Sequence, residues 1–70
     1  MNEYVVIYEQ AEDGGWGAYL PDLPGVIALG DSRDEVAERI KEALVAYAED
    51  LQERGERLPA PHHGAGTVAA

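Results

Sequence analysis

Cysteine is absent from this 70-residue chain, phenylalanine is absent as well, and basic residues are scarce. Without cysteine, neither a disulfide framework nor a thiolate metal site can reinforce the fold. A domain of this length buries only about 60% of the surface that its unfolded chain exposes, so its core is small. Dense packing or association with another chain must supply the remaining stability. We therefore expect a single domain, residues 1–70, with a tendency to form homo-oligomers.

Basic residues are also few: the chain has five Lys and Arg and fourteen Asp and Glu, which gives a formal net charge of -9. The basic residues are interspersed with acids, so phosphates would be repelled and direct binding to nucleic acid is not expected. A compact anion suits a basic protein partner, since complementary charge raises the encounter rate. The alternative is that the charge serves only solubility, and composition alone favours that interpretation.

Long hydrophobic runs are also missing. No segment approaches the roughly 20 consecutive apolar residues of a membrane helix. The first residues, Met1-Asn2-Glu3-Tyr4, have no basic segment followed by an apolar run, so they do not resemble a signal peptide. We therefore expect a cytoplasmic protein.

Three strand-like segments occupy the first thirty residues. Glu3–Gln10 and Trp16–Leu20 are rich in strand-forming types, and the Asp-Gly-Gly sequence between them is a hairpin signal. The second segment ends at Pro21–Gly25, whose prolines cannot donate to a strand ladder, and Val26–Leu29 supplies the third. The pattern predicts an α+β fold that begins with a three-stranded antiparallel meander.

One long helix is predicted from about residue 33 to residue 54. Before it, the Ser32 hydroxyl can accept backbone N–H groups and Glu35 can reach back, which is a capping box. Apolar residues then recur at spacings of three and four, as expected for one buried helix face: Val36, Ile40, Ala43, Leu44, Tyr47, Ala48 and Leu51. Gly55 supplies the left-handed stop.

The end of the chain leaves two alternatives open. Thr67-Val68 is compatible with a short fourth strand, whereas the small residues of 62–70 bury little and equally suit a flexible tail. The pair His62-His63 fits a solvated tail. Neighbouring side chains of an extended segment point in opposite directions, so this pair is not expected to chelate a metal.

Both faces of the predicted sheet are apolar, yet a single helix can cover only one of them. Strand side chains alternate between faces, so Tyr4, Val6 and Tyr8 share a face. Large bare apolar patches are uncommon on soluble monomers, and we therefore expect these three residues to form an association face. Exposed tyrosines that tolerate water through their hydroxyls are the alternative.

The sequence contains no recognisable catalytic grouping. HExxH, CxxC and nucleophile-elbow motifs are absent. Gly14–Gly17 lies in a hairpin with no helix after it to bind phosphate. Asp22, Asp31 and Glu35 would suffice by number for Mg²⁺, but each has a local role in a turn or a cap. We predict no catalytic residue, no metal ligand and no cofactor, and therefore no enzyme.

A set of motifs in fixed order resembles the HicB antitoxin family. The set comprises Tyr4-Val5-Val6-Ile7, Asp13-Gly14-Gly15-Trp16, Pro21-Asp22-Leu23-Pro24-Gly25 and Gly30-Asp31-Ser32. Where the family usually has Glu-Ala in the helix start, this chain has Glu35-Val36-Ala37. Leu58-Pro59-Ala60-Pro61 is similar to the family's Ile-Pro-x-Pro stretch, so the resemblance covers residues 3 to 61.

The resemblance implies a β-β-β-α-β domain similar to a truncated RNase H fold. It also implies a partner, a small basic HicA toxin that cleaves mRNA. Nuclease activity is not implied, because the segments 4–7, 16–20 and 26–29 contain no Asp or Glu. No second helical pattern follows the first, so the DNA-binding module of many family members is not expected. The candidate partner-binding residues are Tyr8, Trp16, Tyr19, Pro21, Asp22, Leu23, Pro24 and Gly25. The alternative function is that of a self-associating structural or regulatory protein without a toxin partner.

Overall fold

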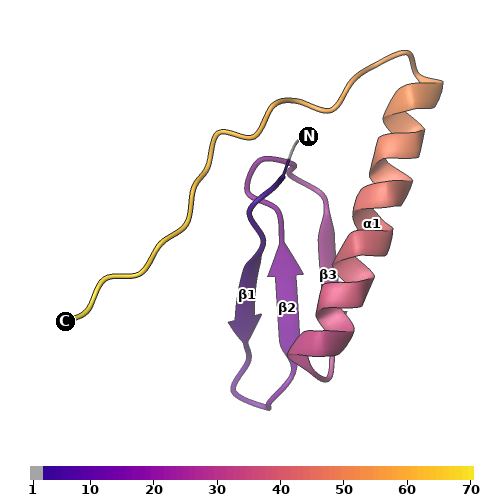
Figure 1. Ribbon diagram of the computed structural model, residues 1–70. Helices are drawn as coiled ribbons and strands as arrows, with labels where there is room; N and C mark the ends of the chain where they lie inside the picture. Colours follow the sequence, from indigo (N-terminus) through magenta and orange to yellow (C-terminus); the bar gives the residue numbers. More distant parts are fainter. Residues whose placement is uncertain (1–2) are drawn as a thin grey trace.

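Three antiparallel strands and one helix form the fold in the computed structural model, which describes residues 3–70 (Figure 1). The strands β1 (Ile7–Gln10), β2 (Trp16–Tyr19) and β3 (Ile27–Gly30) form one sheet in the order β1-β2-β3. Helix α1 (Arg33–Glu53) packs along one face of this sheet, in contact with β2 and β3. The predicted α+β class and antiparallel meander are confirmed.

Two turns connect the strands and set their register. In the hairpin between β1 and β2, Gly14 has a φ of 92°, a conformation that glycine adopts without steric cost. Between β2 and β3, the Leu20 N–H donates to the Val26 carbonyl at 3.2 Å and closes the segment Pro21–Gly25. The two turns lie at opposite ends of the sheet (Figure 1).

Both ends of α1 are capped by local hydrogen bonds. At the start, the Glu35 N–H donates to Ser32 Oγ at 3.1 Å. The Glu35 carboxylate in turn accepts from the Asp31 N–H at 3.0 Å, one residue before the usual partner of a capping box. At the end, Gly55 has a φ of 73° and donates its N–H to the Gln52 carbonyl at 3.0 Å, which satisfies one of the last helical carbonyls.

The hydrophobic core lies between α1 and the sheet. Its buried residues are Ala18, Leu20, Leu23, Val26, Val36 and Ile40. Small residues on the sheet allow the helix to approach closely. A Cβ atom added to Gly30 would lie 2.6 Å from Glu35 Oε1 and 3.0 Å from Val36 Cγ2.

Tyr4, Val6 and Tyr8 lie on the helix side of the sheet, where they pack against this core. The prediction that they form the uncovered face is therefore wrong. Tyr8 stands opposite Ala18 in the ladder, and Ala18 is buried beneath α1. Because side chains alternate along a strand, the residues between them belong to the other face.

Residues 54–70 contain no strand, so the fourth strand considered at Thr67-Val68 is not formed in this structure. The segment turns back from the end of α1 and runs past the sheet (Figure 1). Leu58 packs against the core, and the Tyr4 hydroxyl donates to the Pro59 carbonyl. The description as a truncated RNase H fold and the flexibility of residues 62–70 stay predictions.

Candidate functional site

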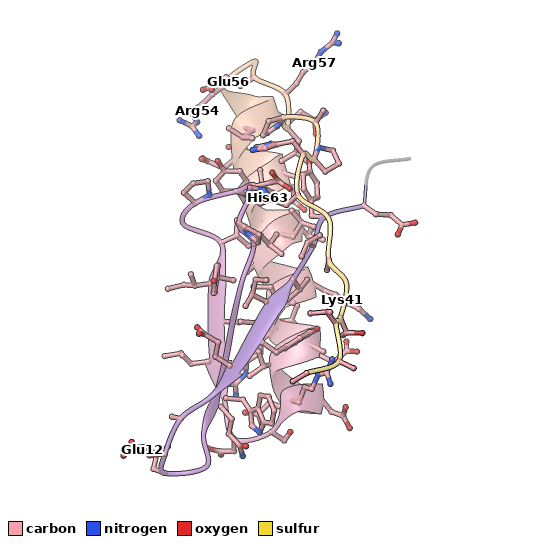
Figure 2. The ribbon with its side chains drawn as sticks, turned by 90° about the vertical axis from the view of Figure 1, so that its left-hand side faces the viewer. Glu12, Lys41, Arg54, Glu56, Arg57 and His63 are labelled. Carbon is pink, nitrogen blue, oxygen red and sulfur yellow. The ribbon has the colours of Figure 1, made fainter. Side chains whose placement is uncertain are left out.

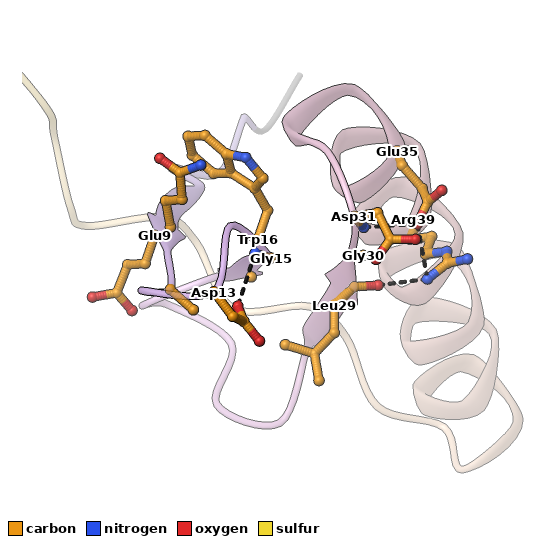
Figure 3. Close-up of a pocket in the computed structure, with 12 residues that line it drawn as sticks. Glu9, Asp13, Gly15, Trp16, Leu29, Gly30, Asp31, Glu35 and Arg39 are labelled. Atoms are coloured by element: carbon orange, nitrogen blue, oxygen red, sulfur yellow. Dashed lines mark hydrogen bonds and ion pairs between the residues drawn. The ribbon is translucent and has the colours of Figure 1, made fainter.

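An open groove of about 780 Å³ lies at the hairpin end of the sheet (Figure 3). The hairpin, the end of β3 and the first turns of α1 surround it. Its charged lining residues are Glu9, Asp13, Asp31, Glu35 and Arg39. Four carboxylates against one guanidinium make the groove anionic, which favours a cationic ligand.

The cationic residues nearest this groove are occupied by contacts within the chain. Arg39 donates to the Leu29 carbonyl at 2.6 Å and lies 3.3 Å from Glu35 Oε1. The Arg33 guanidinium lies over the Tyr8 ring, 4.6 Å from its centroid, at a distance typical of a cation–π contact. These contacts hold both arginines in place and leave the surplus of negative charge at the groove.

The remaining acids of the groove differ in how they are held. Asp13 Oδ1 accepts the Gly15 N–H at 2.9 Å, which fixes this carboxylate in the hairpin turn. Glu9 and Asp31 form no ion pair within residues 3–70. Trp16 is also among the lining residues, but its side chain lies on the helix side of the sheet, where it packs against the core.

Other charged side chains are distributed along the long axis of the molecule (Figure 2). Glu12 marks the hairpin tip, whereas Arg54, Glu56 and Arg57 lie at the opposite end, where α1 terminates. Arg54 pairs there with Asp50 at 3.0 Å. Two of the five basic residues are therefore far from the groove.

The face of the sheet away from α1 is largely apolar, and nothing within residues 3–70 covers it. Tyr19, Ile27 and Leu29 are 39%, 64% and 71% exposed. Tyr19 stands opposite Ile27 in the ladder, and Leu29 also lines the groove. The apolar face and the acidic groove are thus continuous and could contact one partner together.

The candidate partner-binding residues fall in three places. Trp16 lines the groove, and Tyr19 lies on the uncovered face. Tyr8 packs on the helix side of the sheet. The loop Pro21–Gly25 lies at the other end of the sheet from the hairpin (Figure 1). Leu23 is 1% exposed and serves the core, whereas Pro24 and Gly25 are exposed.

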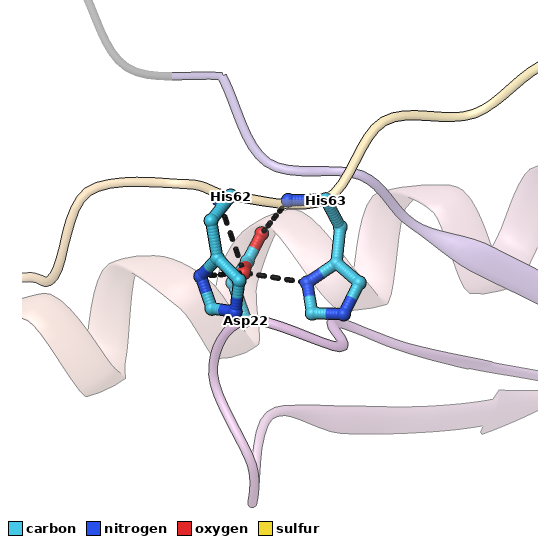
Figure 4. A group of neighbouring side chains, drawn as sticks. All are labelled: Asp22, His62 and His63. Atoms are coloured by element: carbon cyan, nitrogen blue, oxygen red, sulfur yellow. Dashed lines mark hydrogen bonds and ion pairs between the residues drawn. The ribbon is translucent and has the colours of Figure 1, made fainter.

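Asp22 is a buried acid of the Pro21–Gly25 loop, and it holds the C-terminal segment (Figure 4). His62 Nδ1 and His63 Nδ1 each lie 2.7 Å from Asp22 Oδ1. The backbone N–H groups of His62 and His63 donate to the same carboxylate at 3.2 and 3.4 Å. The expectation of a purely solvated histidine pair is corrected, because both rings contact a buried carboxylate.

The hydrogen bonds to Asp22 also affect its ionisation. Burial of the carboxyl raises its pKa, but the His63 side chain and the backbone N–H of His62 lower it by more, so the pKa of Asp22 lies below its ordinary value. The carboxylate form is thus favoured by its partners. Asp22, His62 and His63 also form a group whose ligand atoms lie within 4.8 Å of one another, close enough for a metal ion.

Sequence reasoning missed Ile27 and Leu29, and it considered Asp31 and Glu35 of the groove only as a candidate Mg²⁺ group and a helix cap. The alternation in Val26–Leu29 contained a usable signal, because Ile27 and Leu29 share one face while Val26 and Ala28 share the other. The groove gave no local signal, since it brings together a hairpin and a helix start that lie about twenty residues apart in the sequence.

The fold and the groove define a small α+β domain with an acidic site beside an uncovered sheet face. Residues 4–69 match the model of a family described as HicB_like antitoxin of bacterial toxin-antitoxin system. The chain therefore belongs to the HicB-like antitoxin family, as the motifs indicated. No helix within residues 3–70 is long and apolar enough to cross a membrane.

Individual proteins and one solved structure are similar to this chain. A UPF0150 protein of Thermoplasma acidophilum is 39% identical over 57 residues, which cover 81% of this chain and 83% of that protein. Antitoxin HicB 1 of Photorhabdus laumondii is 36% identical over 58 residues, 83% of this chain but 37% of the longer relative. The crystal structure of the N-terminal domain of Burkholderia pseudomallei antitoxin HicB superposes with a TM-score of 0.70 at 28% identity, covering 90% of this chain and 71% of that one.

Proposed function

We propose that this chain is an antitoxin-type binding module that occludes a small basic, mRNA-cleaving toxin of the HicA type. Membership of the HicB-like antitoxin family supports a role in a toxin-antitoxin system. The observation that best supports a basic partner is the groove, which is lined by four carboxylates and one arginine. The role is binding, and no catalytic step is proposed.

The groove and the uncovered face would contribute in different ways. Exposed ion pairs give only about 0–1 kcal/mol each, so the carboxylates of Glu9 and Asp31 mainly steer association and select a basic partner. They would occupy the places that RNA phosphates take on the toxin. The apolar side chains of Ile27 and Leu29 would supply more of the affinity, because a partner can remove their exposed area from water.

Self-association is the second candidate, and the same uncovered face favours it. Tyr19, Ile27 and Leu29 form a continuous apolar strip on a face that nothing covers within residues 3–70. A second copy could close that strip through a two-fold contact. A homo-oligomer could still present its acidic grooves, so this candidate is compatible with toxin binding.

A growth-rescue experiment tests the proposed function. The chain is co-expressed with a HicA-type toxin, encoded by an adjacent reading frame where one exists, and growth and co-purification are measured. The double variant Glu9→Lys/Asp31→Lys should rescue growth poorly and associate slowly, with a weaker dependence on salt. The matched control Glu49→Lys/Glu53→Lys changes the net charge equally on exposed positions of α1 far from the groove.

Two results would contradict the proposal. Failure of the unmodified chain to bind or to rescue would remove the toxin-binding role. Equal loss in both double variants would show that overall charge, and not the groove, determines binding.

A further inference from the structure

We propose that Asp22, His62 and His63 bind one divalent transition-metal ion, Zn²⁺ by their ligand chemistry, and that the ion fastens the C-terminal segment to the Pro21–Gly25 turn. The three side chains come from two segments about 40 residues apart in sequence. They meet on the surface above the turn (Figure 4). This site is separate from the acidic groove, which lies at the other end of the sheet.

The donor atoms indicate the class of metal. Imidazole nitrogen and carboxylate oxygen are common ligands of Zn²⁺, and three protein ligands leave a fourth position for water. Ca²⁺ and Mg²⁺ prefer shells made of oxygen atoms, whereas this group offers one carboxylate and two imidazoles. Ni²⁺ and Cu²⁺ accept the same donors, so they are useful probes of the same site.

The ligand atoms lie within 4.8 Å of one another and can form a metal shell after the two rings adjust. Both Nδ1 atoms lie 2.7 Å from Asp22 Oδ1. Bonds of about 2.0 to 2.1 Å in a tetrahedral shell separate neighbouring ligand atoms by about 3.3 Å, so each nitrogen must withdraw by roughly 0.6 Å. The side chains of His62 and His63 are 75% and 45% exposed. Their rings can therefore rotate to make room without disturbing the core.

The carboxylate, by contrast, is already fixed. The side chain of Asp22 is 1% exposed, and its two oxygens accept the backbone N–H groups of His62 and His63 at 3.2 and 3.4 Å. Hydrogen bonds to a ligating group orient it and raise metal affinity. The site thus combines one rigid, buried oxygen ligand with two adjustable nitrogen ligands.

A bound ion would replace the hydrogen bonds between the rings and Asp22 with coordinate bonds. Those hydrogen bonds require a hydrogen on Nδ1, and metal binding requires the lone pair of the same atom, so protons and metal compete. The ion would join the turn to a segment that is otherwise held by Leu58 in the core and by the contact of Tyr4 with the Pro59 carbonyl. Since the three ligands meet only in the folded chain, zinc should stabilise that state.

Calorimetric titration of Zn²⁺ into the full chain tests this proposal. The expected result is one ion per chain. His62→Gln and His63→Gln should each weaken zinc binding by at least about tenfold. Even the loss of a residue that only hydrogen-bonds to a metal ligand lowers metal affinity ~10- to 100-fold. Asp22→Asn should do the same, whereas the matched control Asp34→Asn, an exposed acid on α1, should bind as the unmodified chain does.

A second measurement reports the structural effect of the ion. Zinc should slow hydrogen exchange of the backbone amides in residues 58–63 of the unmodified chain and leave it unchanged in the double variant His62→Gln/His63→Gln. Both histidines are exposed, so these variants remain informative even if Asp22→Asn does not fold. The absence of saturable binding, or one-to-one binding that survives in the double histidine variant, would overturn the proposal. Binding of equal strength in a folded Asp22→Asn variant would also overturn it, because the histidine pair alone would then suffice.

Discussion

The uncovered face of the sheet gives the sharpest mutational prediction. Ile27→Thr/Leu29→Thr should weaken binding of the toxin, or self-association, by about 30-fold. Ile27 and Leu29 are 64% and 71% exposed, and complete burial of such a side chain contributes about 1.5–3 kcal/mol. A partner that covers the exposed two-thirds therefore gains roughly 1–2 kcal/mol per residue. Thr retains one methyl group, so the double variant should lose about 2 kcal/mol, and each 1.4 kcal/mol is a factor of ten.

The stability of the free chain provides the internal check on this prediction. Thr keeps the strand preference of a β-branched residue, and exposed substitutions usually change stability by less than about 0.5 kcal/mol. The urea midpoint should therefore stay nearly constant while the dissociation constant, measured by calorimetry or sedimentation, rises. Val45→Thr is the matched control, because Val45 is 56% exposed on α1, away from the sheet. Unchanged binding in the double variant, or equal weakening in Val45→Thr, would refute the reasoning.

Three further predictions concern the fold. Leu23→Ala should lower the free energy of unfolding in urea by about 2–5 kcal/mol, because Leu23 is 1% exposed and the shorter side chain leaves a cavity. A decrease below ~1 kcal/mol would show that the Pro21–Gly25 turn is not part of the core. Ser32→Ala should cost about 1 kcal/mol through loss of the hydrogen bond from Glu35, measured as a lower melting temperature, whereas Ser32→Asp should retain the cap. The metal-free chain should release its C-terminal segment in acid. The folded pKa of Asp22 lies below the ordinary 3.8, so its stabilisation is present above that value and disappears as the pH falls through the lower, folded pKa. Hydrogen exchange of the His62 and His63 backbone amides at several pH values should follow this course, and Asp22→Asn should abolish the step.

The helix was predictable because its signals are local. The hydroxyl of Ser32 and the carboxylate of Glu35 act within one turn, and Gly55 provides the left-handed residue that ends α1. The apolar spacing also identified the buried face, since Val36 and Ile40 are 0% and 4% exposed. Such features depend on neighbours three or four residues away, which the sequence displays directly.

The choice of sheet face was not predictable from residues 4–8 alone, although the predicted strand Glu3–Gln10 forms only from Ile7 to Gln10. The sequence Tyr4-Val5-Val6-Ile7-Tyr8 is apolar at every position, so an alternating pattern cannot assign either side to the helix. The neighbouring strands determine which face of the sheet packs against α1. Ala18 and Gly30 are small enough to allow α1 to approach, and Ala18 pairs with Tyr8. The close approach of α1 therefore requires the face with Ala18 and Gly30. Tyr8 lies on that face, and Tyr19 lies on the uncovered face.

The contact of Asp22 with His62 and His63 escaped prediction for a different reason. It joins residues 40 and 41 positions apart, through a segment that has neither helix nor strand. The two rings are inclined by 43° with centroids 4.5 Å apart. Adjacent histidines can therefore converge on one oxygen when the backbone between them departs from a regular strand.

The central claim is that the chain binds and occludes a basic mRNA-cleaving toxin. The most direct test is a titration of the purified chain into a purified HicA-type toxin while cleavage of a defined RNA is followed. We predict that cleavage falls linearly and stops at a fixed molar ratio, and that Glu9→Lys/Asp31→Lys requires a marked excess. Cleavage that continues at full rate in the presence of excess unmodified chain would contradict the claim.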